Sequence, residues 1–61
     1  MNTHSRQIIG YIKKERVVTS SEIAKMLKIS WNTADSWLKE LLIEGKITRK
    51  KMEGVNLWME K

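Results

Sequence analysis

Hydrophobic residues recur at helical spacing in three stretches of this chain. In the first stretch, residues 4–15, the apolar positions Ile8, Ile9, Tyr11 and Ile12 are interleaved with basic and polar residues. Apolar residues that return with a 3.6-residue period gather on one side of a helix. The pattern therefore predicts an amphipathic helix over residues 4–15.

Gly10 lies in the middle of this predicted helix. Glycine in a helix interior costs about 1 kcal/mol relative to alanine, because it loses more backbone freedom on folding. We therefore expect another segment to pack closely against the helix at Gly10.

The second helical stretch begins at a capping box. Thr19 and Glu22 are spaced so that the threonine oxygen accepts from the Glu22 amide while the Glu22 carboxylate accepts from the Thr19 amide. The helix therefore starts at Ser20. Before it, the adjacent β-branched residues Val17 and Val18 favour a short strand. The predicted inward face of this helix consists of Ile23, Ala24 and Leu27.

A third helix follows a turn at Lys28 and Ile29. Ser30 is a favourable N-cap residue, and Gly45 suits the left-handed position just after a helix C-terminus. The helix is therefore predicted to run to Glu44. Its apolar stripe, at positions i, i+4, i+7 and i+8, consists of Ala34, Leu38, Leu41 and Leu42.

Two short runs with high β-propensity complete the chain, at residues 47–51 and 55–59. They flank Met52, Glu53 and Gly54, and glycine supplies the positive φ that a tight hairpin turn requires. A β-hairpin is therefore predicted. Alternation along its second strand predicts an inward face formed by Val55, Leu57 and Met59.

Three helices followed by a hairpin make an α+β fold that is mostly α. The two later helices with the hairpin form a helix-turn-helix with a wing. Residues 1–61 contain no repeat, low-complexity tract, proline or Gly/Ser linker, so we expect a single domain. A chain this short buries only about 60% of its unfolded surface, which leaves no room for a cofactor cleft.

The balance of charge indicates a polyanionic partner. The chain has 12 Lys and Arg against 7 Asp and Glu, for a formal net charge of +5. Nucleic acid fits this charge; the alternative is that the charge serves solubility alone. Cysteine is absent, and so are a signal-peptide apolar region and any run near the ~18 apolar residues of a membrane span. We expect a cytoplasmic protein without disulfides, cofactor or membrane contact.

The joint spacing of the helix-packing residues and the glycine stop resembles winged helix-turn-helix transcription regulators. The matching positions are Glu22, Ile23, Ala24, Leu27, Ile29, Ser30, Thr33, Ala34, Leu38, Leu41, Gly45, Lys46 and Ile47. The resemblance implies that the third helix enters the major groove, that the wing touches the backbone or minor groove, and that the second helix meets a phosphate. It also implies a transcription regulator associated with the nucleoid.

The start of the third helix carries the predicted base contacts. The resemblance implies that Asn32 and Thr33 face the bases, where the Asn32 amide can pair with N6 and N7 of adenine and Thr33 can meet a thymine methyl or a phosphate. The alternative is that both residues only stabilise the first turn by local hydrogen bonds. Many relatives have arginine near Ser36, and its absence predicts modest specificity. The full set implied by the resemblance is Ser30, Trp31, Asn32, Thr33 and Ser36.

Cations on the hairpin form the second predicted contact. Four lie within six residues: Lys46, Arg49, Lys50 and Lys51. We expect them to bind phosphates, although lysines on strand edges also prevent aggregation. Lys39 extends this footprint on the third helix. Ser20 and Ser21 offer amides and hydroxyls to a phosphate, or act in capping alone.

Three tryptophans and one carboxylate receive separate interpretations. Trp37 is expected to be half-buried, whereas Trp31, beside the N-cap of the third helix, is the tryptophan to test for contact with DNA or protein. Trp58 is expected to pack at the sheet edge or in a dimer surface rather than stack on nucleic acid. For Asp35, a favourable interaction with the helix dipole is preferred over accepting from a cytosine amine or orienting a neighbouring cation.

Two classes of function remain after enzymes are set aside. An enzyme is not expected, because the single histidine, His4, lies near the terminus and no metal-ligand spacing or phosphate loop is present. The first class is a transcription regulator that binds duplex DNA, and the second is a winged helix that docks on protein in a transcription or replication assembly. One module covers only about 600–1,000 Å² on DNA, so the first class predicts a homodimer, built through the first helix or the last strand.

Overall fold

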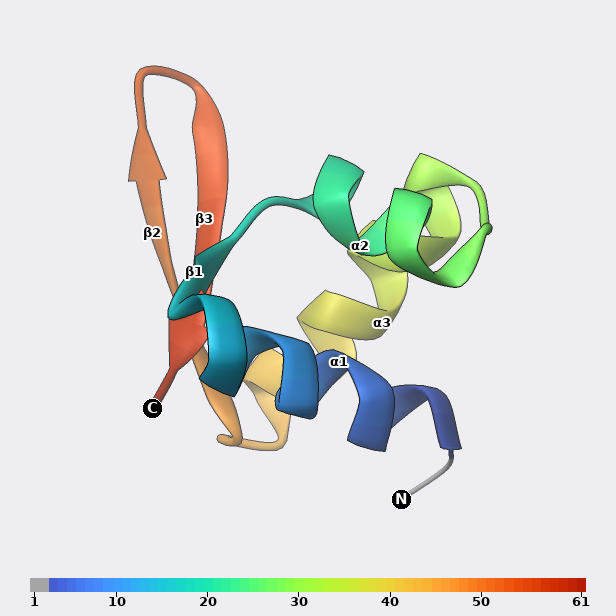
Figure 1. The fold of residues 1–61 in the computed structure, drawn as a ribbon. Coiled ribbons are helices and arrows are strands. Elements are labelled where there is room, and N and C mark those ends of the chain that lie inside the picture. Colours follow the sequence, from blue (N-terminus) through green and yellow to red (C-terminus); the bar gives the residue numbers. More distant parts are fainter. Residues whose placement is uncertain (1–2) are drawn as a thin grey trace.

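The computed structural model describes residues 3–61 and contains three helices beside a small sheet (Figure 1). The elements are α1 (Thr3–Glu15), β1 (Val17–Val18), α2 (Ser20–Leu27), α3 (Trp31–Ile43), β2 (Ile47–Met52) and β3 (Val55–Glu60). The β2-β3 hairpin projects beyond the helices at one end of the molecule. The predicted α+β fold, with its C-terminal hairpin, is confirmed.

The caps that begin α2 and α3 form as predicted. The Glu22 amide donates to Thr19 Oγ1 at 3.2 Å, and the Thr19 amide donates to Glu22 Oε1 at 3.1 Å, so the capping box is complete. Ser30 Oγ accepts from the Thr33 amide at 3.2 Å. Gly45 adopts a φ of 79°, the left-handed conformation that ends α3. These local signals fix the helix boundaries.

The three strands form an antiparallel sheet in the order β1-β3-β2. β3 is the central strand, paired along β2 on one side and with β1 on the other, where Val18 lies opposite Trp58. Glu53 and Gly54 form the hairpin turn with φ values of 51° and 81°. Two positive φ angles are what a two-residue type I′ turn requires, so the chain reverses directly between β2 and β3.

The core lies where the helices meet one face of the sheet. The helices contribute residues predicted for their inward faces, and the sheet contributes Val18, Ile47 and Trp58. Among residues 3–61, the buried apolar side chains are Ile8, Ile12, Val18, Ile23, Ala34, Leu38, Leu41, Ile47 and Trp58. Ile29, in the turn between α2 and α3, packs against this core, as predicted.

The predicted inward face of β3 is wrong. Trp58 is completely buried, whereas Val55 is 48% exposed and Leu57 and Met59 are only half-buried. The strand therefore turns the side that carries Trp58 toward the helices. An indole buries about 150–250 Å², more than any neighbouring side chain, which explains why it takes the core side. Trp58 lies neither at an exposed sheet edge nor in a dimer surface.

Gly10 lacks the close neighbour that we expected. A Cβ added to Gly10 would meet no atom within 4 Å. Gly10→Ala is therefore expected to raise the free energy of unfolding by roughly 0.5–1 kcal/mol, because alanine has the better helix propensity and nothing opposes its methyl group. Urea denaturation of both proteins measures this difference. A less stable alanine variant would contradict it.

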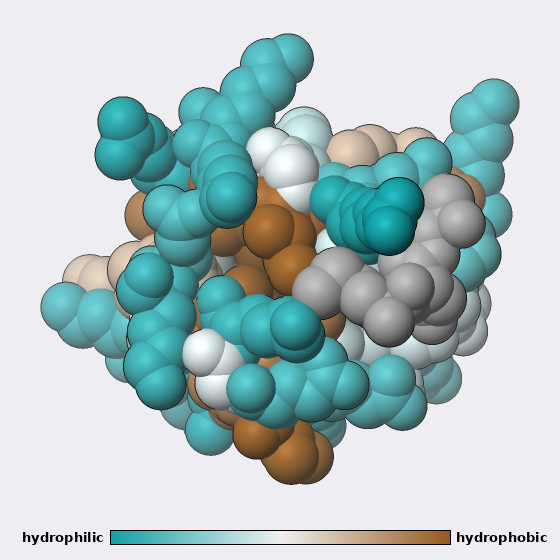
Figure 2. Space-filling view, turned by 90° about the horizontal axis from the view of Figure 1, so that it is seen from below, coloured by the Kyte–Doolittle hydropathy of each residue, from teal (hydrophilic) through white to brown (hydrophobic). Residues whose placement is uncertain are grey.

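An apolar area lies on the face opposite the hairpin tip. Figure 2 views the molecule from below relative to Figure 1 and shows this area bordered by hydrophilic side chains. α1 and the last turn of α3 lie at this lower end of the molecule (Figure 1). Their apolar residues include Ile9 and Leu42, which are half-buried, and Ile43, which is 85% exposed.

Candidate nucleic-acid interface

A hollow lies where the start of α2, the start of α3 and the tip of the hairpin meet. It is lined by Thr19, Ser20, Ser21, Trp31, Gly54, Val55 and Asn56. None of these residues is acidic. Because the start of α3 and the hairpin tip line one hollow, they lie on a common side of the molecule. A single surface can therefore combine both predicted contacts.

The first turn of α3 is accessible. Trp31 is 50% exposed, Asn32 and Ser36 are exposed, and Thr33 is half-buried. The Ser30 hydroxyl donates to Thr33 Oγ1 at 2.8 Å, so these two side chains bond to each other at the N-cap. The Asn32 amide has no hydrogen-bond partner within residues 3–61. Local bonding therefore occupies Thr33, whereas Asn32 is open to a ligand.

The hairpin cations have no acidic partners in the described part of the chain. Within residues 3–61 the ion pairs join Lys13 to Glu60 and Lys39 to Asp35. All four cations of the predicted wing are exposed: Lys46, Arg49, Lys50 and Lys51. Their charge is therefore available to an outside anion.

The register of the hairpin divides these cations between two faces. Residues directly opposite each other on paired strands project from the same face. Arg49 lies opposite Trp58, and Lys51 lies opposite Asn56, which lines the hollow. Lys50 alternates with them and therefore projects from the other face.

Two more contacts complete the geometry of these cations. The Arg49 guanidinium carbon lies 6.0 Å from the centre of the Trp58 ring, within the range of a cation–π interaction. Lys46 comes just before β2, at the base of the hairpin and away from its tip. Arg49 and Lys51 thus project from the same face of the hairpin as Asn56, which lines the hollow.

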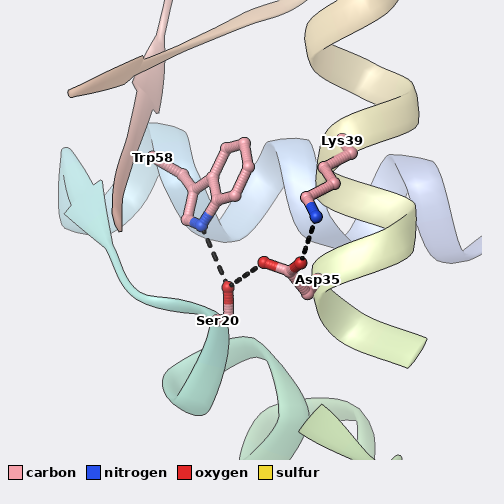
Figure 3. A network of polar contacts seen from close by, with 4 residues as sticks. All are labelled: Ser20, Asp35, Lys39 and Trp58. Atoms are coloured by element: carbon pink, nitrogen blue, oxygen red, sulfur yellow. Dashed lines mark hydrogen bonds and ion pairs between the residues drawn. The ribbon is translucent and has the colours of Figure 1, made fainter. Parts of the chain in front are cut away.

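The two serines at the start of α2 differ in accessibility. Ser21 is exposed, whereas Ser20 is 4% exposed. Ser20 Oγ accepts from the Trp58 indole N–H at 3.1 Å and donates to Asp35 Oδ1 at 3.1 Å (Figure 3). The Ser20 hydroxyl is therefore engaged inside the protein, which leaves the Ser21 hydroxyl for the predicted phosphate contact.

The predicted interaction of Asp35 with the helix dipole is wrong. It lies beyond the first turn of α3, where the dipole effect has faded, and it is 7% exposed. Its Oδ2 pairs with Lys39 Nζ at 3.0 Å. A signal for its burial was present, because Asp35, Leu38 and Leu42 follow the i, i+3, i+7 spacing of one helix face. The contact with Ser20, 15 residues away, had no such signal.

Comparison with known proteins identifies the fold. No protein-family model and no curated protein matches the sequence. The structure of this chain is similar to the crystal structure of the oxidized form of MarR from E. coli, with a TM-score of 0.88 over 100% of this chain and 16% sequence identity. This chain has the winged helix-turn-helix fold. It spans 45% of the MarR chain, less than half of its length.

Four elements make up the helix-turn-helix and the wing of this fold. α2 and α3 form the helix-turn-helix, and β2 and β3 form the wing. Within residues 3–61, no helix is both long and apolar enough to cross a lipid bilayer. The same residues include no group of three His, Cys, Asp or Glu side chains that could hold a metal ion.

Proposed function

We propose that this protein binds duplex DNA as a small transcription regulator. The observation that carries the proposal is the hollow shared by the start of α3 and the tip of the wing. The major groove, about 12 Å wide, admits an α-helix. With α3 in that groove, the wing on the same side reaches the neighbouring backbone.

The accessible residues divide into one base reader and several phosphate ligands. Asn32 reads a base through its free amide, because it is exposed on the first turn of α3. Arg49 and Lys51 bind phosphates beside the hollow, and Ser21 binds one at the start of α2. Such a regulator would work in the cytoplasm, on the nucleoid.

A salt series on the wild-type protein tests this function. Binding of a labelled random-sequence duplex is measured by fluorescence anisotropy at several salt concentrations. The logarithm of the affinity should fall with the logarithm of salt by about 0.9 per phosphate contact, because each contact releases a counterion. A second titration with heparin, a polyanion that is not a duplex, is the control. Equal affinity for heparin and duplex would indicate general polyanion binding. A response that does not change with salt would overturn the proposal.

Asn32→Ala is expected to change sequence preference and leave random-sequence affinity almost unchanged. A bidentate amide–adenine pair discriminates against the wrong base by about 1–3 kcal/mol, so its loss should relax one position of the preferred site. Selection from a randomised duplex pool, followed by sequencing, measures the preference of both proteins. Identical preferences would remove Asn32 as the base reader.

We further propose that two copies bind together through the face opposite the wing tip. That face carries the apolar area of Figure 2. The two elements at this end carry opposite charges, since α1 is basic at Arg6 and Lys14 while Glu40 in α3 and Glu44 just after it are acidic. A two-fold dimer sets each patch against its opposite. Sedimentation at micromolar concentration tests the dimer, and a monomer with and without DNA would overturn it.

One observation favours protein docking as a second candidate function. Trp31 is 50% exposed at the start of α3, and exposed aromatic residues are enriched where proteins meet. A salt-independent response in the DNA titration would direct attention to this alternative.

A further inference from the structure

A line of polar contacts connects the wing to the exposed side of α3 (Figure 3). The Trp58 indole in β3 donates to Ser20 in α2, Ser20 donates to Asp35 in α3, and the Lys39 ammonium donates to the same carboxylate. Trp58, Ser20 and Asp35 are 0%, 4% and 7% exposed. We call these four residues the polar chain. Burial fixes Trp58, Ser20 and Asp35, so Lys39, the exposed residue of the polar chain, is attached to a rigid support.

Lys39 is the point at which the polar chain reaches solvent. Its side chain is 54% exposed, whereas the Asp35 side chain is 10% exposed. An ammonium group has three donors, and the 3.0 Å contact with Asp35 engages one of them. The remaining donors are available to an anion from outside.

Lys39 also lies on the part of α3 that would face DNA. Asn32, Ser36 and Lys39 are exposed, and their spacing of i, i+4 and i+7 places them on one helix face. An ammonium held on this face lies on the same side of α3 as the predicted base reader, Asn32, about two helical turns further along. Within residues 3–61, Lys50 and Lys51 in the wing form no ion pair.

We propose that Asp35 is a positioning residue that holds the Lys39 ammonium in place for a DNA phosphate beside the base-reading face of α3. This inference rests on the proposed DNA-binding function. A free lysine side chain loses rotamer entropy when it is immobilised. Lys39 has already lost much of that freedom through its contact with Asp35, so binding a phosphate costs it less.

Charge and positioning predict opposite effects of Asp35→Asn. The substitution removes a negative charge near the phosphates, which by charge alone should tighten binding. It keeps an oxygen that accepts from Ser20 but removes the anion that holds Lys39. Positioning therefore predicts weaker binding, by roughly fivefold, although the protein has become more positive.

A double-mutant cycle measures the coupling between the two residues. Duplex affinity and its salt dependence are determined for the wild type, Asp35→Asn, Lys39→Gln and the double variant. Lys39→Gln should weaken binding by roughly five- to tenfold and reduce the salt slope by about 0.9 in the wild type. In the Asp35→Asn background its effect should be less than twofold. Arg16→Gln, at an exposed residue between α1 and β1, has the same charge change and is the matched control.

The outcomes separate this inference from the function on which it rests. A wild type that does not bind duplex DNA ends both. A wild type that binds, with tighter binding by Asp35→Asn or an equal effect of Lys39→Gln in both backgrounds, overturns the positioning role alone.

Should Asp35→Asn lose its helical circular dichroism signal, NMR of the lysine side-chain nitrogens in the wild type answers the same question. The Lys39 ammonium should be more ordered than that of Lys25, an exposed lysine on α2 without an ion pair in the described residues. Equal mobility of the two groups would overturn the inference.

Discussion

Trp58→Ala is expected to destabilise this protein severely. Trp58 is the largest of the fully buried side chains and contacts α2 through its indole N–H. Truncation of a buried tryptophan to alanine costs about 3–5 kcal/mol. At roughly 0.05–0.15 kcal/mol per residue, a chain of this length has a total free energy of unfolding of about 3–9 kcal/mol. The substitution therefore removes between about a third and all of the free energy of unfolding, which far-UV circular dichroism and urea denaturation measure.

Two further substitutions separate the volume of Trp58 from its hydrogen bond. Trp58→Phe keeps an aromatic ring in the core but loses the donor to Ser20, and should cost about 1–3 kcal/mol while the protein stays folded. Trp31→Ala, at a tryptophan that is 50% exposed, should change stability by about 0.5 kcal/mol or less. A Trp58→Ala protein as stable as the wild type would place the indole outside the core.

Neutralising the two wing cations beside the hollow is expected to have the largest effect on DNA binding. The double variant Arg49→Gln with Lys51→Gln should lose two phosphate contacts. The salt slope should then fall by about 1.8, and affinity at 0.1 M salt should fall by roughly 50-fold. All duplex sequences should be affected alike, because phosphates carry no sequence information. Anisotropy titrations with several duplexes measure both quantities.

The hairpin supplies its own matched control. Lys46→Gln with Lys50→Gln removes the same charge from the base and the opposite face of the wing, as the strand register indicates. This second pair should reduce affinity several-fold less than the first. Equal losses from both pairs would mean that the attraction depends on net charge and that the wing has no preferred face.

Most of the fold was predictable because its signals are local. The capping box of Thr19 and Glu22, the N-cap at Ser30 and the glycine at Gly45 each act within a few residues of the helix end that they define. The helical stripes are equally local, since one face of each helix meets the core. A short chain with clear caps therefore specifies its helices without knowledge of their partners.

The phase of β3 was not predictable in the same way. Val55, Leu57 and Met59 alternate as an inward face would, yet Trp58 on the other side is the buried residue. An alternating pattern tells which residues share a face but not which face meets the helices, and here both faces contain apolar residues. The decision depends on contacts such as the one with Ser20, 38 residues away.

The candidate interface was predictable as a set but not in its divisions. Charge and spacing identified the wing cations together, but the strand register was needed to separate Arg49 and Lys51 from Lys50. Ser20 and Ser21 are equivalent in sequence terms, and only the tertiary packing buries one and exposes the other. Local patterns name the residues near the surface, whereas the fold determines where each of them points.

The three tryptophans occupy different environments, so the intrinsic fluorescence of the protein can report on three separate regions. Trp58 is enclosed, Trp31 is half-exposed beside the hollow, and Trp37 is stacked on the His4 ring with centroids 4.5 Å apart. Variants that retain one indole each, with phenylalanine at the other two positions, would give separate emission spectra for the core, for the mouth of the hollow and for the contact between α1 and α3. Unfolding and occupation of the hollow could then be followed independently, without an attached dye.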